Sequence, residues 1–152
     1  MASEFLYFGD SQIWYNGKFM PSADARVHVL THGLHYGSCV FEGERAYDGV
    51  VFKSRQHTER LHRSAEIMDF KIPYSVDELE AAKAEVLRLN GSGNKYVRAV
   101  AFRGGEKMMA VAARQNPIHV ASAPWTWPSM FDPAGRMRGI RLDIADYRRP
   151  DP

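Results

Sequence analysis

Three arginines lie in sequence contexts that could recognise anionic groups. The guanidinium group presents its N–H donors in a planar fork that matches a carboxylate or a phosphate. Arg98 follows Tyr96 by two residues, so in a strand both side chains point to one face and can bind a carboxylate together. Arg60 lies early in a predicted helix, where the helix dipole favours a phosphate, and Arg45 lies in a third segment. A single arginine is more often a partner in a surface ion pair, so the three must be considered together.

Other residue types could also form a site. Three histidines have spacings of four and three residues, as metal ligands on a helix can have: His28, His32 and His35. No carboxylate or cysteine accompanies them at a matching spacing, and His28 falls in a predicted strand, so we do not expect a metal site. We interpret Trp127, Met108 and Met109 as core or interface residues.

The elements that must position these side chains can be predicted from the hydrophobic pattern. Short strands are expected around an Asn16–Gly17 turn and in four later segments, with a further half-buried strand near the end: 27–30, 40–47 with 50–53, 96–102, 118–123 and 138–145. One helical turn is expected at 31–37. Helices are expected at 54–70, with Ser54 as N-cap, and after Ser75, which has capping-box spacing to Glu78. Residues 104–116 are expected to form a mobile loop.

Together these elements predict an α+β fold, in which an antiparallel sheet has two helices packed on one face. The 152 residues suit one domain, and 45% of them are hydrophobic. The net charge of +2 gives no reason to expect a nucleic acid or a membrane as partner. A single cysteine, no signal peptide and no long apolar run make a cytoplasmic protein the expectation.

Four segments resemble the class IV aminotransferases, which use pyridoxal 5′-phosphate, and within them the branched-chain amino-acid aminotransferases: 28–37, 40–47, 57–64 and 96–98. The resemblance extends from about Ile13 to Pro152. It implies an N-terminal α+β domain at 1–146 and the start of an interdomain linker at 147–152. The C-terminal cofactor-binding domain would be absent from this chain.

The resemblance also implies a reaction and roles for particular residues. The enzyme would transfer the amino group between the branched-chain L-amino acids (Leu, Ile, Val) and 2-oxoglutarate. Arg60 would bind the cofactor phosphate. The substrate would be bound by a set of seven residues: Tyr36, Phe41, Gly43, Arg45, Tyr96, Arg98 and Trp125. Tyr36 and the 104–116 loop would reach toward a partner subunit, in a homodimer or a higher homo-oligomer.

The sequence departs from the family pattern in several places. Glu44 stands where many relatives have an aliphatic residue, Ala99 where proline is common, and Tyr147 where tryptophan is frequent. None of the six lysines lies in the context of the Schiff-base lysine, so no catalytic residue is expected in this chain and it should be inactive alone. Three alternatives stay open: a D-amino-acid aminotransferase, an aminodeoxychorismate lyase, or a non-catalytic truncated dimerisation domain.

Overall fold

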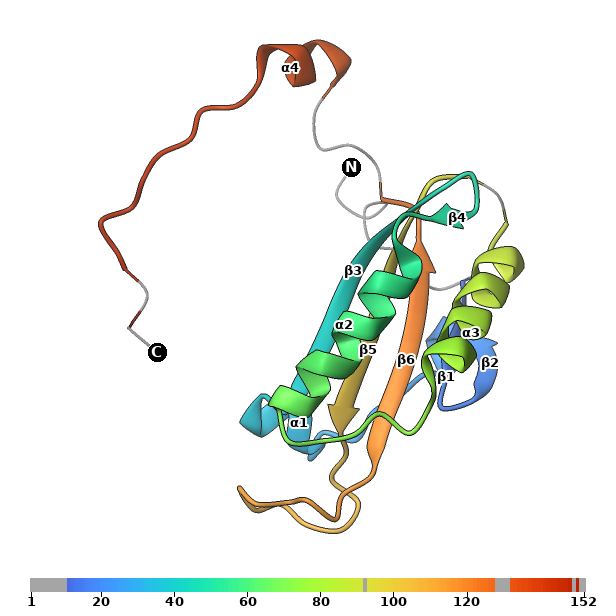
Figure 1. Ribbon diagram of the computed structural model, residues 1–152, viewed down its shortest axis with the longest axis vertical. Coiled ribbons are helices and arrows are strands. Elements are labelled where there is room, and N and C mark those ends of the chain that lie inside the picture. Colours follow the sequence, from blue (N-terminus) through green and yellow to red (C-terminus); the bar gives the residue numbers. More distant parts are fainter. Residues whose placement is uncertain (1–10, 92, 128–131, 149, 151–152) are drawn as a thin grey trace.

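A six-stranded antiparallel sheet dominates the part of the chain that the computed structural model describes, residues 11–91, 93–127, 132–148 and 150. The strand order is β2-β1-β6-β5-β3-β4 (Figure 1). The strands are β1 (Gln12–Tyr15), β2 (Lys18–Pro21), β3 (Cys39–Tyr47), β4 (Val50–Val51), β5 (Lys95–Arg103) and β6 (Ile118–Trp125). Asn16 and Gly17 turn the first hairpin with φ of 48° and 86°, as the Asn-Gly pair predicts.

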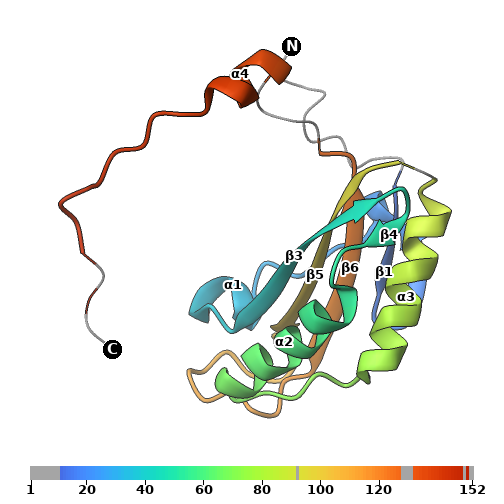
Figure 2. The same cartoon turned by 45° about the horizontal axis from the view of Figure 1, so that its top comes forward.

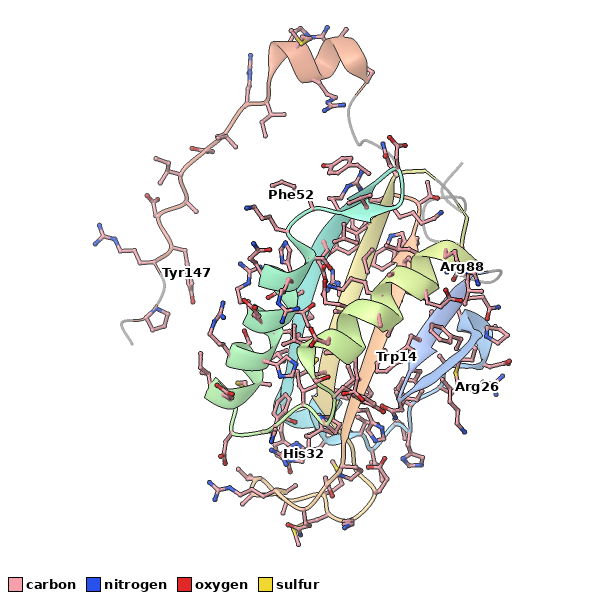
Figure 3. The ribbon with its side chains drawn as sticks, turned by 45° about the vertical axis from the view of Figure 1, so that its right-hand side comes forward. Trp14, Arg26, His32, Phe52, Arg88 and Tyr147 are labelled. Carbon is pink, nitrogen blue, oxygen red and sulfur yellow. The ribbon has the colours of Figure 1, made fainter. Side chains whose placement is uncertain are left out.

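Two helices, α2 (Ser54–Ile67) and α3 (Val76–Leu89), pack side by side on one face of this sheet (Figure 2). Helix α2 lies against β3 and β5, and α3 lies against β1 and β6. The core between the layers includes Leu61, Val86 and Trp14, and Figure 3 shows the position of Trp14 in β1. This arrangement confirms the predicted α+β class with two helices on one face.

The start of each long helix was predicted from a serine, with different outcomes. Ser75 caps α3: its hydroxyl accepts a hydrogen bond from the Glu78 amide, and the Glu78 carboxylate accepts one from the Ser75 amide, so the predicted capping box is confirmed. Ser54 is not the N-cap of α2, which begins after Lys53 at a φ of 55°. The Ser54 hydroxyl instead accepts a hydrogen bond from Lys83 across the helix pair, at 3.0 Å.

The shorter elements lie around the sheet. Helix α1 (His32–Tyr36) confirms the predicted turn, and Gly37 ends it at a φ of 66°, in the left-handed region that glycine adopts without strain. The 3-10 turn η1 (Ser22–Asp24) follows β2, and α4 (Pro133–Arg138) follows the sheet. None of the helices in the described residues is both long and apolar enough to span a membrane.

Two predicted strands are wrong. Residues 27–30 form an irregular connection and a turn, and 139–148 form no strand. Ile140, Leu142 and Ile144 alternate in sequence, but all three are exposed, Ile144 at 93%. No described strand pairs with this segment, which Figure 3 shows around Tyr147, so its apolar face has no surface to pack on.

Candidate functional site

The face of the sheet opposite α2 and α3, here called the open face, carries most of the predicted substrate residues. Along β3, alternate residues are buried under the helices, while Phe41, Gly43 and Arg45 lie on the open face. Strand pairing aligns Gly43 with Arg98 and Arg45 with Tyr96. The next pairing aligns Tyr96 with Trp125 of β6. Six of the seven predicted substrate residues therefore come together on one surface.

Tyr96 and Arg98 form the pair that strand alternation predicted. The Arg98 Nη2 donates a hydrogen bond of 2.9 Å to the Tyr96 hydroxyl. The guanidinium carbon lies 4.1 Å from the centre of the Phe41 ring, which holds the group flat by a cation–π contact. The buried Arg98 Nε has no partner among the described residues. Donors on this guanidinium are thus available to an anion such as a carboxylate.

Gly43 makes room for this pair. It lies directly opposite Arg98, and a Cβ atom built on it would clash with the Tyr96 hydroxyl and approach the ring carbon that carries it to 3.1 Å. Any side chain at this position would displace the Tyr96 ring from β3. The glycine is therefore required by a close approach of side chain to backbone rather than by an unusual backbone angle.

Aromatic rings form one wall of the open face. The ring centres of Tyr96 and Trp125 are 4.7 Å apart, and those of Tyr96 and Trp127 are 4.9 Å apart. Arg45 donates a hydrogen bond of 3.4 Å to the Trp127 carbonyl. Trp127 is a member of this cluster that our sequence interpretation left out. The signal was its spacing of two residues from Trp125, which continues the alternation of β6.

Tyr36 lies outside this cluster. It belongs to α1, which precedes β3, whereas Trp125 ends β6 at the opposite end of the sheet. The Tyr36 ring is 45% exposed and stacks on His32 with ring centres 4.5 Å apart. Its predicted role toward a partner subunit is compatible with this exposure and stays a prediction.

The three histidines singled out for metal binding make other contacts. His32 is buried, with its ring nitrogens 2.6 Å from the Ser38 hydroxyl and 3.0 Å from the Ala110 carbonyl. The His35 ring lies 2.9 Å from the Val29 carbonyl. No group of three potential metal ligands comes together within the described ranges.

The predicted loop, which follows β5, is held at its base by one side chain. The Asn116 carbonyl oxygen accepts hydrogen bonds from the amides of Lys107 and Met108, and its amide nitrogen donates to the Gly104 and Met108 carbonyls. Its predicted mobility and its reach toward a partner subunit stay predictions.

Arg60, the predicted phosphate-binding residue, lies on α2 and therefore on the helical side of the sheet. Its Nε and Nη2 donate hydrogen bonds of 2.7 and 2.5 Å to the two carboxylate oxygens of Glu42. His57 Nδ1 lies 2.8 Å from the same carboxylate. Burial raises the pKa of Glu42, but the hydrogen bonds and charges of Arg60 and His57 outweigh it, so the pKa is lowered from its ordinary value.

A second buried carboxylate, Glu44, points to the same side as Glu42, which confirms the prediction that it faces away from the substrate residues. Its Oε2 accepts a hydrogen bond of 2.7 Å from Lys83, whose side chain is 3% exposed. Burial raises the pKa of Glu44 in spite of this ammonium group. Strand β3 therefore presents recognition residues on one face and two cation-bound carboxylates on the other.

Residues 39–152 match the family described as amino-transferase class IV. The match covers most of the chain and includes every predicted site residue except Tyr36. The chain belongs to this family. The predicted resemblance is thereby confirmed, and the open-face cluster lies in the matched region.

Relatives within the family carry a narrower description. The chain is 40% identical over 144 residues to a branched-chain-amino-acid aminotransferase of Pseudomonas aeruginosa, covering 92% of this chain and 47% of that protein. It is 42% identical over 144 residues to the branched-chain-amino-acid aminotransferase of Escherichia coli K12, with the same coverage. The chain thus spans about half the length of these curated relatives.

Solved structures give the same result for the fold. The branched-chain aminotransferase of Thermoproteus uzoniensis with norvaline superposes with a TM-score of 0.72 at 37% identity, over 77% of this chain and 41% of that one. The branched-chain amino acid aminotransferase from Escherichia coli gives a TM-score of 0.73 at 41% identity, over 78% of this chain and 41% of that one. A further branched-chain amino acid aminotransferase, solved with pyridoxamine 5′-phosphate, gives 0.73 at 38% identity, over 80% and 42%. The predicted fold, that of a class IV aminotransferase N-terminal domain, is confirmed.

Proposed function

We propose that this chain is the N-terminal domain of an enzyme that transfers the amino group between branched-chain L-amino acids and 2-oxoglutarate. The observation that carries the proposal is the open face, where Arg98 and Tyr96 lie beside apolar and aromatic rings. A carboxylate-binding guanidinium next to an apolar wall suits a substrate with one charged end and a hydrocarbon side chain. Membership of class IV and the names of the relatives support the same reaction.

Each residue of the open face has a distinct task in this proposal. Arg98 binds the substrate α-carboxylate through its free N–H groups, and the Tyr96 hydroxyl fixes the plane of the guanidinium. Arg45, one residue pair further along the sheet, adds positive charge for the second carboxylate of 2-oxoglutarate. Phe41 and Trp125 contact the hydrocarbon side chain and exclude water. Tyr36 completes the pocket from the partner subunit, in a homodimer or a higher homo-oligomer.

The residues present fit the phosphate end of pyridoxal 5′-phosphate. Arg60 is 59% exposed although two of its nitrogens bind Glu42, so its remaining N–H groups face outward and suit a phosphate. When bound, this cofactor supplies the electron-accepting ring that stabilises negative charge at the substrate α-carbon. The lysine that carries it would come from the C-terminal domain, beyond the proposed domain at 1–146 and the linker at 147–152. We place this reaction in the cytoplasm.

A chimera tests this function directly. Residues 1–152 would replace the matching half of the Escherichia coli relative, which retains its own C-terminal half. We expect transamination of L-leucine with 2-oxoglutarate and no comparable activity with D-alanine. Arg98→Ala in the chimera should raise the KM for both L-leucine and 2-oxoglutarate, because both present a carboxylate to the same guanidinium.

The outcomes separate the alternatives. Activity with D-alanine but not L-leucine would indicate a D-amino-acid aminotransferase. Activity with neither amino acid, in a folded chimera that binds cofactor, would favour an aminodeoxychorismate lyase or a non-catalytic dimerisation domain. Unchanged KM values in Arg98→Ala would refute the role given to Arg98 and leave the reaction class standing.

A further inference from the structure

Glu42 is a buried carboxylate to which the proposed function gives no task. It lies on β3 between two open-face residues, Phe41 and Gly43, but points to the opposite side, where its side chain is 3% exposed. A carboxylate at this depth requires partners to offset its desolvation. Its partners come from α2: Arg60 binds both oxygens, and His57 binds one.

The geometry points to Glu42 as a positioning residue that sets the Arg60 guanidinium for the cofactor phosphate. This inference rests on the proposed function, because it takes Arg60 as the phosphate ligand. Glu42 itself touches neither cofactor nor substrate in this account. It acts through Arg60 alone.

The manner in which Glu42 binds Arg60 leaves the correct donors free. The contact is side-on, since it uses Nε at 2.7 Å and Nη2 at 2.5 Å. A guanidinium has five N–H donors, and a side-on contact occupies two of them along one edge. The end formed by Nη1 and the second Nη2 hydrogen stays available for a second bidentate anion. Arg60 can therefore bind Glu42 and a phosphate together.

The location also suits access by a ligand. Strand β4 pairs with β3 only at residues 46 and 47, so at the level of Glu42 no described strand lies on the outer side of β3. The Arg60 side chain reaches Glu42 from α2 at this edge, and it remains 59% exposed. A phosphate held by a second domain could approach the free end of the guanidinium from this edge.

Positioning and simple charge attraction predict opposite effects for the neutral variant Glu42→Gln. If Arg60 acted only as a positive charge, removal of a neighbouring negative charge would strengthen phosphate binding. If Glu42 fixes the guanidinium, the freed long side chain must be ordered again at each binding event, and phosphate binding weakens. The sign of the change therefore decides between the two.

The test compares two probes on the 152-residue protein. Pyridoxine 5′-phosphate and pyridoxine differ only in the phosphate, and neither has an aldehyde that would react with lysines. Binding of each is measured by NMR titration, with the Arg60 Nε–Hε signal as the local reporter. We expect the wild type to prefer the phosphorylated probe, and Glu42→Gln to reduce that preference about tenfold, the equivalent of one charge-assisted hydrogen bond.

Two further variants show whether Glu42 acts through Arg60. Arg60→Ala should abolish the preference, and Glu42→Gln should add nothing in that background. Glu85→Gln is the matched control, because Glu85 binds Arg88 side-on at 2.8 and 2.7 Å on α3, and Figure 3 shows Arg88 on that helix. It should leave the preference unchanged. If Glu42→Gln fails to fold, Glu42→Asp keeps the charge but shortens its reach, and it should reduce the preference in the same direction.

Each contrary result overturns a different statement. An unchanged or increased preference in Glu42→Gln overturns the positioning role and leaves Arg60 as the phosphate ligand. A preference that survives Arg60→Ala, or is absent from the wild type, overturns the inference together with the cofactor role of Arg60. Neither result touches the carboxylate recognition by the open face, which the chimera tests.

Discussion

Lys83 should be among the residues whose loss destabilises this fold most. Its ammonium group lies between α2, α3 and β3, 2.7 Å from Glu44 and 3.0 Å from Glu80. The hydroxyls of Thr58 and Ser54 accept further hydrogen bonds from it, at 2.9 and 3.0 Å. In Lys83→Met, all of these acceptors lose their donor. The Glu44 carboxylate, with a side chain that is 0% exposed, then has no counter-ion.

The magnitude follows from this burial. Removal of one partner from a buried ion pair costs about 3–5 kcal/mol, because the other charge stays desolvated. A domain of this size is stable by about 5–15 kcal/mol, so the variant should unfold readily. Replacement of both charges in Glu44→Leu/Lys83→Met should restore stability to within about 1 kcal/mol of the wild type, since well-packed apolar residues commonly substitute for a buried pair.

Acid should partly rescue the single variant. The pKa of Glu44 is raised above 4.5 by burial even with Lys83 present, and loss of the lysine raises it further. A raised carboxyl pKa means that the folded state binds the proton more tightly than the unfolded state. The destabilisation of Lys83→Met is therefore full at neutral pH and shrinks as the pH falls through the raised pKa.

Urea unfolding followed by circular dichroism measures these free energies at about pH 7 and about pH 5. Lys71→Met, at an exposed lysine, is the control and should change stability by no more than about 0.5 kcal/mol. A loss below about 1 kcal/mol in Lys83→Met would refute the reasoning, because it is less than the cost expected for an uncompensated buried charge. An unrestored double variant would refute the pairing with Glu44.

Three further predictions use other parts of the structure. Gly43→Ala should displace the Tyr96 ring and raise the KM for L-leucine in the chimera about tenfold or more, as steady-state kinetics would show; an unchanged KM would contradict the close approach. Ser75→Ala removes the cap of α3 and should cost about 1 kcal/mol in urea unfolding; no loss would mean that the cap is not formed in solution. Carboxyl NMR should show Glu42 titrating below 4.5 and Glu44 above it. Glu42 therefore adds stability above that pH, which is lost as the pH falls through its lowered pKa; shifts of the same sign would contradict the assignment of partners.

Local patterns were sufficient where a feature depends on one strand or one helix. Alternation along β5 predicted that Tyr96 and Arg98 share a face, and alternation along β3 predicted that Glu44 turns away from it. The capping box of α3 could be found from Ser75 and Glu78 because both lie within one helical turn. The same alternation would have placed Trp127 on the open face, had it been continued beyond the end of β6.

Features that depend on how elements pack could not be predicted in this way. The partner of Arg60 is Glu42, eighteen residues away, and only the position of α2 against β3 brings them together. Ser54 has the residue type of an N-cap, but its hydroxyl binds Lys83 from the neighbouring helix. The alternation at 138–145 describes a face that could be buried; whether it is buried depends on a neighbouring strand, about which the pattern carries no information.

The two-sided use of β3 restricts which changes this domain can tolerate in evolution. A one-residue insertion or deletion between Cys39 and Tyr47 would exchange the two faces, so that Glu42 and Glu44 would enter the recognition surface and Phe41 and Arg45 would enter the helical layer. Binding and folding would fail together. Changes of substrate in this domain should therefore arise by substitution along β3, while gains and losses of residues accumulate in the connections at either end.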